Sequence, residues 1–203
     1  MYKDYLVLGG AGLVGTQVVR HIVRSLQPRR IVVASLQKEE AEAACKAHRA
    51  EFGEQVSFVP AWGNLFVPSA MSELSRGAIL TDDHLRRSLL DALYGDYQKG
   101  FEENHLVGLI RRFRPEVVVD SVNTATSFSY QDVFDGVAKV RSWIDDSGFQ
   151  SEGTRDLETF LLSQSTPQLI RHVRFVHTAT RKYGVSVYLK VGTTGTGGMG
   201  LNI

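Results

Sequence analysis

The stretch DYLVLGGAGLVG, residues 4–15, decides the fold class of this 203-residue chain. Its first part is a short apolar run that ends in glycine, and an amphipathic stretch from Gly12 to about Leu26 follows directly. An apolar run that gives way to glycines and then to a helical period predicts a strand, a tight turn and a helix. The chain therefore opens with the first half of a strand-helix-strand unit.

The turn of this unit has a glycine pattern that suits phosphate binding. Gly9, Gly10, Gly12 and Gly15 satisfy both G-x-G-x-x-G and G-x-x-G-x-x-G between a strand and a helix. Glycine permits the tight turn, leaves room for a pyrophosphate and lets the helix approach the strand, while the helix N-terminus offers free N–H groups. We expect a dinucleotide here, and the alternative is a turn that serves only the fold. The expected contacts come from Gly9, Gly10, Ala11, Gly12, Leu13, Val14 and Gly15.

Strands and helices alternate along the rest of the chain. Strands are expected at residues 4–9, 31–35, 56–60, 116–121 and 185–191, and helices at 38–52, about 82–97, 105–113 and 167–183. Parallel neighbours need crossover connections, so this order predicts an α/β fold, a Rossmann-like doubly wound parallel sheet with helices on both faces. The stretches near 67–104 and 127–164 are interpreted as insertions in a single dinucleotide-binding domain over residues 1–203.

Composition and charge argue against several classes of partner. The 23 Lys and Arg residues against 22 Asp and Glu leave a formal net charge of +1, with no basic excess for nucleic acid or an anionic membrane. No apolar stretch approaches the roughly 20 residues of a membrane span, and no signal-peptide pattern is present. A single cysteine, Cys45, can form neither an internal disulfide nor a Cys/His zinc site. A cytoplasmic protein with one hydrophobic core is expected.

The end of the second predicted strand bears on the choice of cofactor. Sites that prefer NAD have an acidic residue about 20 positions beyond the glycines, which binds the ribose 2′-hydroxyl. This chain has Ser35 there, followed closely by Lys38. With no carboxylate to repel a 2′-phosphate, and with a hydroxyl and an ammonium able to bind one, the sequence favours NADP over NAD. The alternative is that Lys38 belongs to a solvated helix face, the charged run 38–42, where Glu39 and Glu40 offset its charge.

Gly63-Asn64-Leu65, directly after the third predicted strand, completes a resemblance to a known family. With the G-x-x-G-x-x-G turn and the strand-helix order up to Thr194, the chain resembles the extended short-chain dehydrogenase/reductase family, which includes NAD-dependent epimerases and dehydratases. That family has Asp in place of Asn64, and the element contacts the adenine. The resemblance therefore implies adenine contacts for Asn64 and Leu65, and the alternative is a plain Gly-Asn turn.

The resemblance also implies roles for two later segments. The loop after the fourth strand lines the cofactor in the family, which implies contacts from Asn123, Thr124 and Ala125. The fifth strand ends where the family places the hydroxyl that hydrogen-bonds the substrate carbonyl. Thr194, or else Thr193, would have that catalytic role.

The family's general acid, a tyrosine with a lysine four residues later, has no counterpart in this sequence. None of the seven tyrosines has that spacing. Tyr188 and Lys190 share one face of a predicted strand, beneath a carboxyl-end site, and are interpreted as structural. In the family the catalytic pair follows the hydroxyl residue, so it would fall beyond Ile203. The resemblance implies a sheet truncated after its fifth strand.

These observations predict the NAD(P)-binding domain of an oxidoreductase or epimerase/dehydratase that acts on an alcohol, a ketone or a sugar-nucleotide substrate. The main alternative is a non-catalytic dinucleotide-sensing or interaction domain, which the missing Tyr/Lys pair favours. A Rossmann-like domain without any nucleotide is a third reading. Family members often dimerise through helices beside the sheet, so a homodimer is the corresponding expectation.

Three other features are expected to carry no separate chemistry. Residues 195–200 also fit G-x-G-x-x-G, but no helix follows them, so a flexible active-site loop is expected there. The six histidines have no metal-ligand spacing, and His172 and His177 are expected on different helical faces. Asp82-Asp83 is predicted to start a helix.

Overall fold

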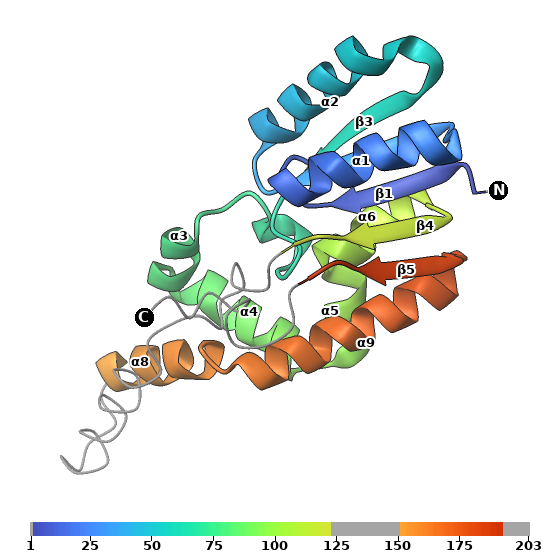
Figure 1. Ribbon diagram of the computed structural model, residues 1–203. Coiled ribbons are helices and arrows are strands. Elements are labelled where there is room, and N and C mark those ends of the chain that lie inside the picture. Colours follow the sequence, from blue (N-terminus) through green and yellow to red (C-terminus); the bar gives the residue numbers. More distant parts are fainter. Residues whose placement is uncertain (1, 123–150, 193–203) are drawn as a thin grey trace.

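The computed structural model describes residues 2–122 and 151–192 (Figure 1). Within these residues, five strands form one parallel sheet in the order β3-β2-β1-β4-β5, which confirms the predicted fold class. The chain runs outward from β1 to one edge and then crosses back to β4. Ligands of open α/β sheets bind at such a reversal. The strands are β1 (Asp4–Leu8), β2 (Arg30–Ser35), β3 (Ser57–Trp62), β4 (Val117–Asp120) and β5 (Val187–Lys190).

The register brings the carboxyl ends of the strands level with one another. Leu8 of β1 pairs with Ala34 of β2 on one side and with Asp120 of β4 on the other. Ser35 of β2 pairs with Trp62 of β3. Because the strands are parallel, the residues that follow them all lie along one edge, at the left of the sheet in Figure 1.

Helices α1 (Leu13–Leu26) and α2 (Lys38–Phe52) cover one face of the sheet. The helical period of α1 buries Val19 and Val23 against β1 and β2, where Val7 and Val33 point to the same face. Helix α2 has the predicted bounds 38–52. A short 3-10 turn, η1 (Gly53–Gln55), leads from it into β3.

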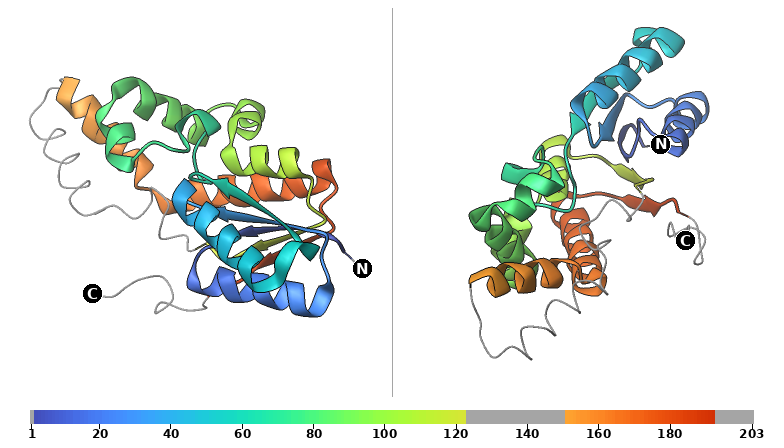
Figure 2. Two further views of the ribbon diagram at one scale, coloured as in Figure 1. Left: turned by 90° about the horizontal axis from the view of Figure 1, so that it is seen from above. Right: turned by 90° about the vertical axis from the view of Figure 1, so that its left-hand side faces the viewer.

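The opposite face is covered by α5 (Tyr97–Glu103), α6 (His105–Phe113) and α9 (Ser165–Tyr183), as Figure 2 shows. Helix α6 has the predicted bounds, and Asn104 caps it by accepting a hydrogen bond from the Val107 N–H at 3.2 Å. Helix α9 ends at Gly184 in the left-handed conformation, with φ of +75°, where the sequence predicted a stop.

A further group of helices lies beyond the carboxyl edge of the sheet (Figure 1). It comprises α3 (Arg76–Thr81), α4 (Asp83–Tyr94) and α8 (Ser151–Leu162), preceded by the 3-10 turn η2 (Ser69–Met71). Asp82 caps α4 by accepting from the Leu85 N–H at 2.9 Å, so the predicted helix start is confirmed. The buried guanidinium of Arg86 connects α4 to α8, because it donates a hydrogen bond to Glu158 at 2.7 Å.

Several expectations about the elements are corrected by the structure. The helix expected over about 82–97 is α4, which ends at Tyr94, three residues early, because Gly95 caps it and Asp96 already caps the next helix, α5. Strand β3 extends to Trp62 rather than residue 60, because Pro60 lies in an edge strand and interrupts no central pairing. The expected one core is three clusters, because the sheet separates its two faces and α3, α4 and α8 pack around their own buried side chains.

Within residues 2–122 and 151–192, no helix is long and apolar enough to cross a membrane.

Candidate functional site

The turn between β1 and α1 requires glycine for reasons that the backbone shows. Gly9 has φ of +72°, a left-handed conformation that side chains disfavour. A Cβ on Gly15 would lie 2.1 Å from the Gly9 carbonyl oxygen, and one on Gly10 would lie 2.8 Å from a methyl carbon of Val33. These three glycines therefore let the helix approach the strand closely.

Gly12 has a different function in the same turn. It caps α1 in an extended conformation without any side-chain hydrogen bond, and no acidic residue stands in the first turn. A Cβ on Gly12 would meet only the Gly9 carbonyl oxygen, at 3.3 Å. The fold thus needs glycine less at position 12 than at 15. A bare helix N-terminus with its positive dipole end exposed is a binding site for anions.

This helix N-terminus opens into a cavity of about 1150 Å³ at the carboxyl ends of β1, β2 and β3. The sequence-predicted residues that line the cavity are Gly9, Ala11, Gly12, Ser35, Lys38, Asn64 and Leu65. Ser121 and Val122, which follow β4, complete the wall at the point where the strand order reverses. The structure therefore brings the glycine turn together with the ends of the second and third strands, as the sequence predicted.

Other predicted contacts lie elsewhere. Gly10 and Gly15 belong to the packing of the turn rather than to the cavity wall. Leu13 and Val14 are 92% and 53% exposed on the first turn of α1 and do not line the cavity, so only their backbone N–H groups, which have no partner within the helix, could contribute to anion binding. The predicted residues that lie outside the described part of the chain are Asn123, Thr124, Ala125, Thr193 and Thr194.

One expectation at the end of β2 is wrong. The sequence led us to expect no carboxylate beside Ser35, whereas the solvated face expected over 38–42 is confirmed by its exposed charged side chains. In the structure, the Ser35 hydroxyl donates to the Glu40 carboxylate at 2.6 Å, and Glu40 lines the cavity. Glu40 is in the first turn of α2, which lies next to the end of β2. Its carboxylate therefore reaches Ser35, although the two residues are five positions apart in the sequence.

Lys38 lies on the same wall. Its ammonium is 3.9 Å from the Glu42 carboxylate and 5.2 Å from the centre of the Trp62 ring. Trp62, Leu36 and Leu74 line the cavity, and the sequence reasoning missed all three. The one signal that could have found Trp62 is its place at the end of the third strand, two residues before Asn64.

Gly63 and Asn64 form a turn directly after β3, and both residues line the cavity. Gly63 has φ of +118°, and a Cβ there would lie 2.6 Å from the His105 ring. The Asn64 side-chain oxygen accepts a hydrogen bond from the Phe66 N–H at 3.0 Å. This bond uses one acceptor direction of the Asn64 side chain, and Asn64 itself lines the cavity.

At the β4–β5 end of the same edge, the polar groups bind one another. Asp120 is 2% exposed, accepts a hydrogen bond from the Tyr188 hydroxyl at 2.5 Å and forms an ion pair with the Lys190 ammonium at 3.0 Å. The Lys190 ammonium also donates to the Val122 carbonyl at 2.6 Å. Burial and the neighbouring Asp120 carboxylate raise the pKa of Tyr188. A tyrosine held in this way stays protonated and is a poor proton donor.

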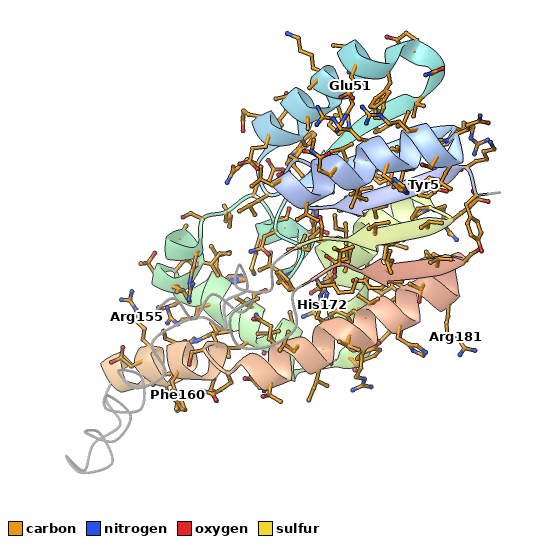
Figure 3. All side chains as sticks on the ribbon, in the orientation of Figure 1. Tyr5, Glu51, Arg155, Phe160, His172 and Arg181 are labelled. Atoms are coloured by element: carbon orange, nitrogen blue, oxygen red, sulfur yellow. The ribbon has the colours of Figure 1, made fainter. Side chains whose placement is uncertain are left out.

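His172 of α9 lies on this side of the sheet (Figure 3), where its ring packs 4.9 Å from the Phe66 ring. Burial lowers the pKa of His172, and the Asp120 carboxylate opposes that shift. His177 is exposed on another face of α9, as expected. Among the residues that the structure describes, no group of three His, Cys, Asp or Glu side chains could hold a metal ion.

The far end of the cavity lies between α1 and α2. Glu51 of α2 accepts hydrogen bonds from Arg20 and Arg24 of α1, both at 2.8 Å, and so closes the groove (Figure 3). His48 of α2 is 2% exposed and packs in a three-ring cluster with Phe52 and Phe58. Burial lowers the pKa of His48.

Comparison with known proteins gives a sparse result. No protein-family model and no curated protein matches the chain. Among solved structures, a short-chain dehydrogenase from Sphingobium yanoikuyae in complex with NADPH is 16% identical, with a TM-score of 0.41 over 94% of this chain and 54% of that one. Pen from Bacillus thuringiensis is 14% identical, with a TM-score of 0.36 over 98% and 52%.

A third similar structure is L-sorbose reductase from Gluconobacter frateurii, complexed with NADPH and L-sorbose, at 12% identity and a TM-score of 0.33 over 100% of this chain and 98% of that one. The chain spans about half the length of the Bacillus and Sphingobium proteins. With all TM-scores below 0.5, these similarities carry no functional argument. The strand order β3-β2-β1-β4-β5 by itself shows the Rossmann-like fold.

Proposed function

We propose that this chain binds a nicotinamide dinucleotide in the cavity at the carboxyl ends of β1–β3, as the cofactor-binding part of an oxidoreductase. One observation carries the proposal. The N-terminus of α1, where the N-cap residue Gly12 has no side chain to bind the free N–H groups, opens into a cavity of about 1150 Å³ beside the reversal of strand order. Anion-binding N–H groups at this place in a doubly wound sheet suit a pyrophosphate.

The residues present fit such a ligand from end to end. The pyrophosphate would lie on Gly12 and the first turn of α1, where a side chain would take its place. The adenosine half would extend toward Ser35 and Trp62, and the nicotinamide half would pass over Ser121 at the end of β4. Once bound, the nicotinamide ring supplies or accepts the hydride. The chain's own residues bind and orient the dinucleotide.

The choice between NAD and NADP depends on Glu40 and Lys38, which border the same wall. The sequence favours NADP because no carboxylate was expected there. A carboxylate 2.6 Å from the Ser35 hydroxyl would bind a ribose 2′-hydroxyl and repel a 2′-phosphate, so we infer a preference for NAD. Removing the charge with Glu40→Gln should shift the ratio of NADP to NAD affinity about fivefold toward NADP, measured by calorimetric titration. An unchanged ratio would show that the Glu40 carboxylate does not set the preference between the two cofactors.

Substrate and partner assignments follow from the resemblance to extended short-chain dehydrogenases/reductases. We propose an alcohol, a ketone or a sugar nucleotide as the substrate, with Thr194 or Thr193 at its carbonyl and Asn123, Thr124 and Ala125 beside the cofactor. An epimerase or dehydratase reaction and a homodimer belong to the same proposal.

A second candidate function is dinucleotide sensing without catalysis, which the β4–β5 end favours. There Asp120 engages both Tyr188 and Lys190, and no tyrosine of the described residues has a lysine four positions later. In this case cofactor binding would change the affinity for another protein rather than start a reaction.

The test is titration of the chain with NADH and NADPH, followed by a hydride-transfer assay with alcohols and ketones. Gly12→Val should abolish binding and leave the fold intact, because its Cβ enters the phosphate position but meets only one backbone oxygen at 3.3 Å. Gly108→Ala in α6, where the added Cβ makes an ordinary 3.4 Å contact, is the control that should bind normally. Unchanged affinity in Gly12→Val would refute the site. Binding without hydride transfer by the whole protein would favour sensing.

A further inference from the structure

The cavity contains an apolar region that neither the phosphate site nor the hydrophobic core explains. Leu36, in the loop after β2, is 49% exposed, and Leu74, after η2, is 40% exposed. Both side chains line the cavity, together with Trp62 at the end of β3. Large apolar side chains that remain exposed and gather in one cavity wall indicate contact with a ligand rather than core packing.

The backbone of Trp62 is held firmly by its neighbours. Trp62 pairs with Ser35 at the end of the sheet, and its carbonyl oxygen lies 2.8 Å from His105 Nε2. The next residue, Gly63, has an N–H group within hydrogen-bond distance of the Ser35 and Leu36 carbonyls, at 3.1 and 3.2 Å. The indole is therefore presented from a rigid strand end, which keeps the entropy cost of binding against it low.

The Trp62 side chain is half-buried and lines the cavity, where Lys38 lies over its ring. The Lys38 ammonium lies 5.2 Å from the ring centre, a cation–π distance, and Lys38 is itself exposed. A mobile lysine over an aromatic ring is easily displaced, because exposed contacts of this kind contribute only about 0.5–1 kcal/mol. A flat aromatic ligand could take the place of the ammonium.

We propose that Trp62 stacks on the adenine base, with Leu36 and Leu74 as further apolar contacts in the same slot. Asn64 already accepts a bond from the Phe66 N–H, so stacking rather than hydrogen bonding supplies most of the affinity for the base. This inference rests on the proposed dinucleotide site and adds the residue that recognises the base. It also makes the site tolerant of other purines, because every purine presents an aromatic face.

The experiment measures ADP binding to the full chain by calorimetry and by tryptophan fluorescence. The sequence has two tryptophans, so Trp143→Phe leaves Trp62 as the only reporter. Stacking predicts quenching of Trp62 by ADP. It also predicts roughly tenfold weaker ADP binding in Trp62→Leu, with nearly normal binding in Trp62→Phe, which keeps an aromatic face. Nicotinamide mononucleotide, which has no adenine, should bind wild type and Trp62→Leu equally.

Tyr2→Leu is the matched control, since Tyr2 is an exposed aromatic residue far from the cavity wall, and it should leave ADP affinity unchanged. Circular dichroism and thermal melts check that each variant folds. Wild-type ADP affinity in Trp62→Leu, or fluorescence that ADP does not change, would overturn the inference while leaving the dinucleotide site in place. Failure of the wild-type chain to bind ADP, NADH and NADPH would instead refute the proposed function, and the inference with it.

Discussion

The two halves of the sheet's carboxyl edge use similar residues in opposite ways. At the ends of β2 and β3, Lys38 and Glu40 stand on the wall of a cavity with exposed side chains. At the ends of β4 and β5, Lys190 and Asp120 bind each other at 3.0 Å, and Asp120 is buried. Each of these two pairs consists of a lysine and a carboxylate-bearing residue. Only the first half leaves them facing the space that a ligand would fill.

The difference shows that polar residues at a carboxyl edge do not by themselves mark a binding site. A buried carboxylate such as Asp120 must be paired, because an unpaired buried charge is strongly destabilising. Its partners, Tyr188 and Lys190, therefore stabilise the fold and are not available to a ligand. Exposed groups such as Lys38 and Glu40 contribute little to stability and remain available to a ligand.

The largest expected effect contrasts two glycines of one turn. Gly15→Ala should lower the free energy of unfolding by about 3 kcal/mol, because the new Cβ would lie 2.1 Å from the Gly9 carbonyl oxygen and must displace backbone. Gly12→Ala should lower it by about 1 kcal/mol or less, the ordinary difference at a helix cap. Urea denaturation measures both. Equal losses would show that the turn does not divide into a packing glycine and a phosphate glycine.

A pair of lysine variants tests the comparison directly. Lys190→Met should cost about 2 kcal/mol of stability, because it removes the cation that pairs with the buried Asp120 carboxylate. Lys38→Met should leave the melting temperature nearly unchanged, since its nearest carboxylate is exposed and 3.9 Å away. If Lys38→Met destabilises the chain as much as Lys190→Met, the two halves of the edge do not differ as proposed.

The smallest expected effect concerns pH and His48, a buried group on the cavity side. Burial lowers the pKa of His48 in the folded chain below the ordinary value of 6.5, so the unfolded chain binds more protons there. Stability should therefore fall as pH falls through about 6.5, with a slope of at most about 1.4 kcal/mol per pH unit from this group. Glu51 opposes the shift, and Arg20 adds to it.

The measurement for His48 is the difference between wild type and His48→Phe, since burial also lowers the pKa values of His105 and His172. The variant should lose less stability than wild type between pH 7 and 5. His21→Phe, a change at an exposed histidine of α1, should follow the wild-type curve. Parallel curves for wild type and His48→Phe would show that His48 takes up its proton without loosening α2.

Much of the fold could be predicted from local patterns, and the reason is visible in particular elements. The glycines of residues 9–15 are required by a positive φ and by close backbone approach, so the sequence shows them directly. Helices α2 and α6 have the predicted bounds because caps and breakers lie within a few residues of their ends. The end of α4 at Tyr94 was placed three residues late, although its signals are local: the Gly95 N–H donates to the Asp91 carbonyl, and the Asp96 carboxylate caps α5 by accepting from the Lys99 N–H.

For the site, local sequence patterns were enough to predict the glycine turn, the N-terminus of α1 without a side-chain cap, and the meeting of that turn with Ser35 and Asn64. Each of these follows from residue type and from the level carboxyl ends of parallel strands. Three contacts became visible only in the folded chain. Glu40 accepts a hydrogen bond from Ser35, Trp62 lines a cavity together with Leu36 and Leu74, and Asp120 pairs with Lys190. These contacts join residues whose side-chain directions depend on how helices and loops pack, which no local pattern encodes.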